Sequence, residues 1–151
     1  MRSKYKNKSK AITLFEILSI ISIVVLLSTI TLGFIKYNQP NIRLYAATKE
    51  IRSYLQSAKE KTISEQKQYG VKFYQEEEKY ELVSLEPNEA VVMSRTLPQE
   101  ISFISIGSFK DNTVIFNKSG AAEENGSIMI KNSRHGQKTI IINPSGYVSE
   151  E

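Results

Sequence analysis

The segment Ala11–Leu27, AITLFEILSIISIVVLL, determines the architecture that we expect for this chain. It opens an apolar stretch, Ala11–Ile35, in which Glu16 is the only formally charged side chain. At about 1.5 Å of rise per residue, a helix of this length can span the ~30 Å hydrocarbon core of a bilayer. A carboxylate inside such a stretch is costly in lipid, so Glu16 indicates a function and requires a partner.

The excess of basic residues belongs to the N-terminus. Residues 1–10 hold five Lys or Arg side chains and no acid, whereas the rest of the chain is close to neutral. Because basic residues beside a membrane segment stay in the cytoplasm, we expect an inside N-terminus and everything after Lys36 outside the cell membrane. This distribution argues against a nucleic-acid-binding domain despite the net charge of +4. The absence of cysteine excludes disulfides, thiolate metal sites and a cysteine nucleophile.

Two simple explanations of the apolar stretch fit poorly. A cleaved signal peptide usually has an apolar region of ~7–15 residues and a small-x-small cleavage site. Here the apolar run is longer and ends in Leu32-Gly33-Phe34-Ile35-Lys36. An uncleaved signal anchor fits the length and the charge, but it leaves Glu16 without a role.

The segment Lys10–Glu16, KAITLFE, followed by an apolar run, resembles the class III leader of type IV pilins and pseudopilins. The resemblance implies a leader peptide at residues 1–11, cleavage between Ala11 and Ile12 by a prepilin peptidase, and N-methylation of Ile12. Ala11 and Ile12 stand where the family usually has Gly and Phe or Met. The resemblance also implies that Glu16 pairs with the new α-amine of a neighbouring subunit during filament assembly. The alternative is that Glu16 only stabilises the helix N-terminus through the macrodipole, worth ~0.3–1 kcal/mol.

A second, amphipathic helical segment is predicted over residues 37–67, after the proposed transmembrane helix of residues 12–36. Pro40 predicts a bend or break near residues 38–41, or the first position of a fresh helix. The predicted buried stripe has helical spacing and consists of Leu44, Ala47, Ile51, Leu55, Ala58 and Thr62. We expect this stripe to pack against the chain's own sheet.

Residues 68–151 are predicted to form a β-rich globular domain. Alternation over Tyr69–Tyr74 and Lys79–Val83 indicates a hairpin, and Glu76–Glu78 between them reads as a solvated turn. Ile101–Ile104 is a further strand candidate. Three short β-rich runs follow, within Thr113–Gly120, Asn125–Ile130 and Thr139–Val148, with turns at Gly120, Gly126, Gly136 and Gly146. We expect one antiparallel sheet that covers the helical stripe.

The C-terminal pattern is Phe116-x-x-x-Gly120, then Gly126-x-Ile128-x-Ile130, then a strand ending in Ser145-Gly146-x-Val148. It resembles the GspH/FimT branch of minor pseudopilins, and in particular the ComGD-like competence pseudopilins of Gram-positive bacteria. The resemblance implies an α+β, pilin-like fold: a long N-terminal helix, membrane-spanning in its first half and amphipathic in its second, packed on a C-terminal antiparallel β-sheet.

The expected function is that of a minor pseudopilin in a pilus-like filament, in the competence (DNA-uptake) machinery, with type II secretion or a type IV pilus as alternatives. Its expected partners are the prepilin peptidase, other pseudopilins, the membrane and, indirectly, an inner-membrane assembly platform and its ATPase. We expect no cofactor, no metal site and no enzymatic activity, since His135 is the only histidine and no nucleophile elbow or phosphate loop occurs. The rival class is a signal-anchored extracytoplasmic enzyme or binding domain.

A direct contact with DNA is not expected either. The C-terminal tail, Tyr147–Glu151, is acidic, and the nearest basic cluster is Arg134, His135 and Lys138, in a predicted loop.

Overall fold

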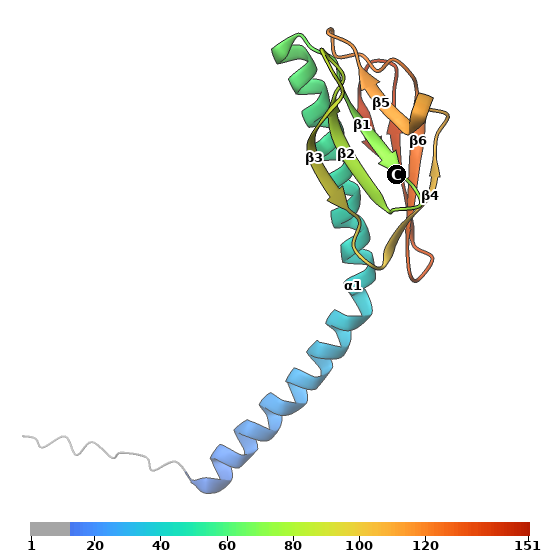
Figure 1. The fold of residues 1–151 in the computed structure, drawn as a ribbon. Helices are drawn as coiled ribbons and strands as arrows, with labels where there is room; N and C mark the ends of the chain where they lie inside the picture. Colours follow the sequence, from blue (N-terminus) through green and yellow to red (C-terminus); the bar gives the residue numbers. More distant parts are fainter. Residues whose placement is uncertain (1–12) are drawn as a thin grey trace, which may run out of the picture. The chain divides into compact units, whose positions relative to one another are not determined.

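The computed structural model describes the backbone of residues 13–151 and the side chains of residues 13–29 and 36–151. A long helix, α1, is followed by β-strands (Figure 1), which confirms the predicted α+β class. The elements are α1 (Leu14–Glu65), β1 (Tyr69–Tyr74), β2 (Lys79–Ser84), β3 (Ala90–Thr96), β4 (Ile101–Ile106), the 3-10 helix η1 (Lys110–Asn112), β5 (Thr113–Phe116), β6 (Gly126–Asn132), β7 (Gln137–Ile142) and β8 (Val148–Glu150). Within the described part of the chain, no helix has both the length and the apolar character needed to cross a membrane.

The chain divides into two compact units, with the boundary after Asn38. The second unit, Gln39–Glu151, has its own core. The prediction of a single sheet is wrong, because this unit contains two antiparallel four-stranded sheets. We call them sheet A (order β3-β2-β1-β5) and sheet B (order β4-β6-β7-β8). Periodicity marks a strand but does not determine its partner, and the chain passes from sheet A to sheet B after β3. Phe73 on β1 and Phe103 on β4 join the two sheets edge to face, with ring centroids 5.8 Å apart.

The predicted helical stripe is confirmed. Its six members are all buried, from 0 to 5 % exposed: Leu44, Ala47, Ile51, Leu55, Ala58 and Thr62. The five apolar members belong to a core that includes residues from strands of both sheets. Burial of this stripe is the main stabilising term for the helix within the unit, at about 25 cal/mol for each Å² of apolar surface removed from water.

Ion pairs on two flanks of α1 connect it to both sheets. Glu50 accepts from Arg95 of β3 at 2.7 Å, and Arg52 lies 3.4 Å from Glu150 of β8. Residues two positions apart point about 200° apart around a helix. The helix is therefore held by the edge strand of sheet A on one side and by that of sheet B on the other.

Neither the predicted break near Pro40 nor the alternative of a fresh helix that starts there is found, and a bend at this position stays a prediction. Pro40 lies inside α1, and its side chain is buried. A proline removes one helical hydrogen bond, and the helical assignment continues on both sides of it. The helix ends at Glu65, where Gln66 takes a left-handed conformation (φ 55°) and its side-chain amide donates to the Ile63 carbonyl at 2.8 Å.

The first hairpin is confirmed, since β1 pairs with β2 from Tyr69–Ser84 to Tyr74–Lys79. Its glutamate turn is only partly solvated. Glu76 and Glu77 are exposed, but Glu78 is half-buried and accepts from the Phe103 backbone N–H at 2.8 Å. Glu78 thereby connects the turn of sheet A to β4 of sheet B, a contact between residues too far apart in sequence for a local pattern to reveal.

Candidate functional site

Thr13 caps the N-terminus of α1. Its hydroxyl oxygen accepts from the Glu16 backbone N–H at 3.2 Å, and its carbonyl accepts from the same N–H at 3.1 Å. The spacing Thr-x-x-Glu is that of a capping box, in which the side chain at the first flanking position satisfies a helix donor that has no intrahelical acceptor. Glu16 thus lies in the first turn, where the helix dipole favours a negative charge.

The helix beyond this cap exposes apolar side chains. Leu14 is 86 % exposed and Phe15 77 %, and large apolar residues continue along the segment: Ile17, Leu18, Ile20, Ile21, Ile23, Val24, Val25, Leu26 and Leu27. A helix that is apolar over most of its surface is stable only when lipid or other helices cover it. Residues 14–27 therefore present an apolar surface over most of this part of the helix.

The hydroxyl groups on this segment are satisfied within the helix. Ser19, Ser22 and Ser28 donate to the carbonyls four residues earlier at 2.7–2.8 Å, and Thr29 donates to the Leu26 carbonyl at 2.8 Å. Such internal bonds remove the cost of placing a hydroxyl in surroundings without water. Apart from Glu16, the described side chains of residues 14–29 thus bring no unmet polar group into an apolar environment.

The predicted processing positions, Ala11 and Ile12, lie outside the described residues. Glu16 is described, and its side chain is exposed at the first turn of α1. Sequence reasoning assigned Glu16 but missed Thr13 as the helix cap, although the Thr-x-x-Glu spacing before an apolar run was the signal that could have revealed it.

Two glycines of the C-terminal pattern, Gly120 and Gly146, meet on the helix. Gly120 and Gly146 both have positive φ angles (86° and 72°), and both lie against α1 at Lys59. The Lys59 ammonium donates to the Gly146 carbonyl at 3.0 Å. A β-carbon on Gly146 would overlap the Gly120 carbonyl oxygen, so the two turns pack backbone to backbone. The pattern that carried the resemblance is therefore an architectural feature that fixes sheet B to α1.

Of the predicted basic cluster, Arg134 and His135 are exposed in the turn between β6 and β7, whereas Lys138 lies in β7 and not in a loop. Buried Asn132 organises this turn, and the sequence analysis did not identify it. Among the described residues, no group of three or more His, Cys, Asp or Glu side chains is placed to hold a metal ion.

The fold is shared by two solved structures. The minor pseudopilin EpsH from the type 2 secretion system of Vibrio cholerae aligns with a TM-score of 0.61 at 11 % identity, over 72 % of this chain and 96 % of that one. The type IV minor pilin FimU of Pseudomonas aeruginosa aligns with a TM-score of 0.58 at 14 % identity, over 78 % and 92 % of the two chains. The chain therefore has the fold of these pilin-like proteins.

The sequence comparison agrees. Residues 47–146, about two thirds of the chain, match the family described as type II transport protein GspH, and the chain belongs to this family. No curated protein matches the sequence. The family and the fold are those of structural pilin and pseudopilin subunits, which removes the support for the rival enzyme class.

Proposed function

We propose that this chain is a minor pseudopilin subunit of a pilus-like filament, anchored in the cell membrane by residues 12–36 with its N-terminus in the cytoplasm. The observation that carries the proposal is a GspH-family domain joined to a helical segment with exposed apolar side chains. Lipid covers that segment before assembly, and the helices of neighbouring subunits cover it afterwards. The proposed anchor includes residues outside the described part of the chain, so it rests on the sequence.

The proposed processing removes residues 1–11. A prepilin peptidase cuts between Ala11 and Ile12 and methylates Ile12, which leaves a membrane segment (12–36), an amphipathic segment (37–67) and the β-rich domain (68–151). Mass spectrometry of the mature N-terminus tests this step, and the expected species starts at N-methylated Ile12. An intact Met1, or cleavage beyond Gly33, would contradict it.

In the proposed assembly, the Glu16 carboxylate pairs with the Ile12 α-amine of a neighbouring subunit. Within an apolar filament core, removing one partner of such a pair leaves the other charge buried without compensation. That uncompensated charge destabilises the assembled state. Glu16→Gln keeps the size of the side chain and removes the charge. We expect this variant to insert and to be processed, but not to enter the filament.

Thr13→Ala is the matched control for Glu16→Gln. It removes the helix cap, worth about 1 kcal/mol, and leaves the Glu16 charge in place. We expect its incorporation, measured in sheared filament fractions, to stay close to that of the wild type. Equal loss in both variants would assign Glu16 to helix stability instead of assembly.

The machine that we propose is the competence pseudopilus, supported by the ComGD-like C-terminal pattern. The assembly platform and its ATPase would drive filament growth. The description of the matched family favours type II secretion as the second candidate. A deletion strain distinguishes the two candidates. We expect it to lose transformation while protein secretion and piliation stay normal. Normal transformation with loss of secretion or of piliation would assign the subunit to another machine.

A further inference from the structure

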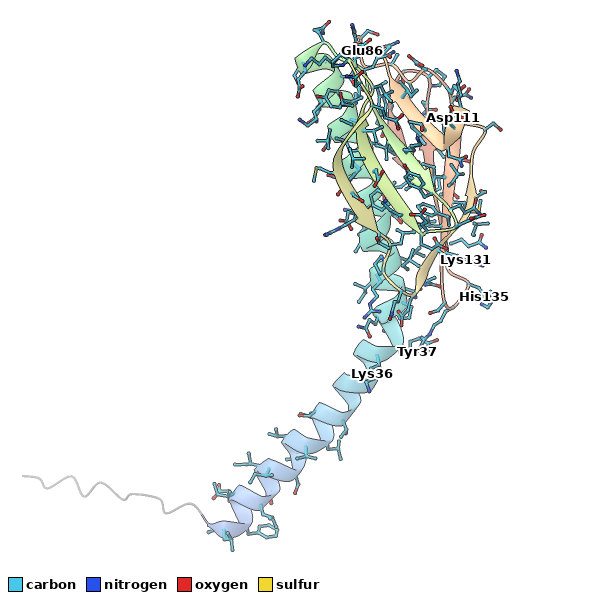
Figure 2. All side chains as sticks on the ribbon, in the orientation of Figure 1. Lys36, Tyr37, Glu86, Asp111, Lys131 and His135 are labelled. Atoms are coloured by element: carbon cyan, nitrogen blue, oxygen red, sulfur yellow. The ribbon has the colours of Figure 1, made fainter. Side chains whose placement is uncertain are left out.

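Three cationic side chains lie in and beside the turn between β6 and β7. We call residues 131–138 the basic turn; its cations are Lys131 at the end of β6, Arg134 in the turn and Lys138 in β7, and His135 lies next to Arg134. Lys131, Arg134 and His135 are exposed, and Figure 2 shows Lys131 and His135 at the same end of the globular unit. No acidic residue occurs in the sequence between Glu124 and Glu150.

The basic turn has a defined conformation built on Asn132. The Asn132 side chain is buried (4 % exposed), and its carbonyl oxygen accepts from the backbone N–H groups of Arg134 at 3.0 Å and Gly136 at 2.8 Å. The Asn132 backbone N–H also donates to the Gly136 carbonyl at 2.9 Å. The charges are thus presented by an ordered turn.

The basic turn is attached to the start of the globular unit's own helix. The Asn132 side-chain N–H donates to the Asn41 side-chain oxygen at 2.8 Å. Asn41 follows Ile35, the end of the apolar stretch, by six residues. Even a fully extended chain of this length spans only ~20 Å, which limits how far Asn41 can lie from the end of the anchor.

Two of the nearby acids have basic partners on α1. Glu100, beside the turn, lies 3.1 Å from Arg43, and Glu150 on β8 lies 3.4 Å from Arg52. Glu151 exchanges backbone hydrogen bonds with Thr139, at the inner end of the turn. The outer part of the basic turn is therefore dominated by cations.

We propose that the basic turn binds anionic lipid headgroups of the membrane in which the chain is anchored, and so holds the globular unit at the bilayer surface before assembly. This inference rests on the anchor in the proposed function. Lipid phosphate is favoured over nucleic-acid phosphate, because Asn41, to which the turn is bonded, follows the end of the apolar stretch by only six residues. In addition, the rest of residues 39–151, with 11 Lys or Arg against 15 Asp or Glu, is net acidic and repels a nucleic acid. Each Lys or Arg near an anionic surface strengthens binding by roughly fivefold.

The test uses the full chain in vesicles and exploits the absence of cysteine. Ser133→Cys places a fluorophore in the basic turn, and quenching is measured with a headgroup spin-labelled lipid. Vesicles of phosphatidylcholine alone are compared with vesicles that also contain phosphatidylglycerol. We expect strong quenching only with phosphatidylglycerol, and its loss in high salt, which screens exposed charges.

Two matched controls accompany the measurement. Ser145→Cys places the same probe beside Gly146, which contacts Lys59, about 27 Å along the helix from Asn41. This probe should stay unquenched in both vesicles. Combining Ser133→Cys with Lys131→Gln, Arg134→Gln and Lys138→Gln should reduce headgroup contact by roughly fivefold for each charge removed. Unchanged circular dichroism would show that this variant is folded.

The outcomes separate the inference from the proposed function. A chain that floats with both vesicle types, but whose Ser133 probe is quenched equally in both, overturns the lipid contact and leaves the anchor standing. A chain that floats with neither overturns both. Binding of a short DNA duplex by the basic turn, without headgroup quenching, would also overturn the inference and assign the turn to nucleic acid.

Discussion

Asn132 and Asn41, which are 91 positions apart in the sequence, are joined by a side-chain hydrogen bond of 2.8 Å. The bond connects the turn between β6 and β7 to the helix where the globular unit begins. The same Asn132 side chain accepts from two backbone N–H groups of its own turn. One buried amide therefore shapes the basic turn and also determines its position.

Asn132→Ala should destabilise the globular unit by about 2–3 kcal/mol, because it leaves two backbone donors and Asn41 without their partner. Urea unfolding of the fragment of residues 39–151 measures this loss. Ser133→Ala, at the exposed neighbouring position, should change stability by less than about 0.5 kcal/mol. Equal effects of the two substitutions would show that Asn132 does not organise the turn.

Ile51→Ala should cost about 2–5 kcal/mol in the same fragment, since Ile51 is 0 % exposed in the core under both sheets. Ile42→Ala makes the same chemical change on the same helix at a position that is 63 % exposed. That control should cost only a few tenths of a kcal/mol. A similar cost at both positions would contradict the assignment of the buried face.

Gly146→Ala should be among the most destabilising single changes in sheet B, at about 2 kcal/mol or more. The added methyl group would meet the Gly120 carbonyl, and the φ of 72° is strained for any residue with a β-carbon. Thermal unfolding followed by circular dichroism measures the effect. Ser145→Ala, one residue earlier and exposed, should unfold like the wild type, and tolerance of Gly146→Ala would disprove the close packing of the two turns.

Glu81 should contribute to the acid sensitivity of the globular unit. Its buried carboxylate lies 2.7 Å from the Lys79 ammonium and accepts from the Tyr74 hydroxyl at 3.1 Å. The hydrogen bond from Lys79, more than any other contact, lowers the pKa of Glu81. Because the folded pKa is below the unfolded value of about 4.3, the contribution to stability is complete above that value and is lost as the pH falls through the folded pKa.

Glu81→Gln should therefore cost about 1–2 kcal/mol at neutral pH, and much less once Glu81 of the wild type is protonated. Urea midpoints of both proteins, measured across the acid range, give this difference. Glu77→Gln is the control, since the Glu77 side chain is 65 % exposed and lies 3.9 Å from Lys79. A cost of Glu81→Gln that is independent of pH would rule out the charge as its origin.

Several features were predictable from the sequence because they depend on local periodicity. The stripe from Leu44 to Thr62 repeats every three or four residues, and the hairpin at Tyr69–Val83 alternates, so both follow from the geometry of helix and strand. The strand β3 was missed, although Ala90–Met93 is an apolar run between Pro87 and Pro98. Its residues are all exposed, so no alternation of buried and exposed positions marked it.

By itself, the sequence determined the class of the protein as α+β and pilin-like. The features that determined it are the KAITLFE segment before a long apolar run, the amphipathic helical stripe, and strands separated by glycine turns in a pattern that resembles one pilin branch. Only the tertiary structure decided that the strands form two sheets, that Glu78 contacts Phe103, and that Asn132 contacts Asn41. The physical reason is the range of the interactions. Propensity, periodicity and capping act within a few residues, whereas these pairings join distant segments, and their positions depend on how the whole core packs.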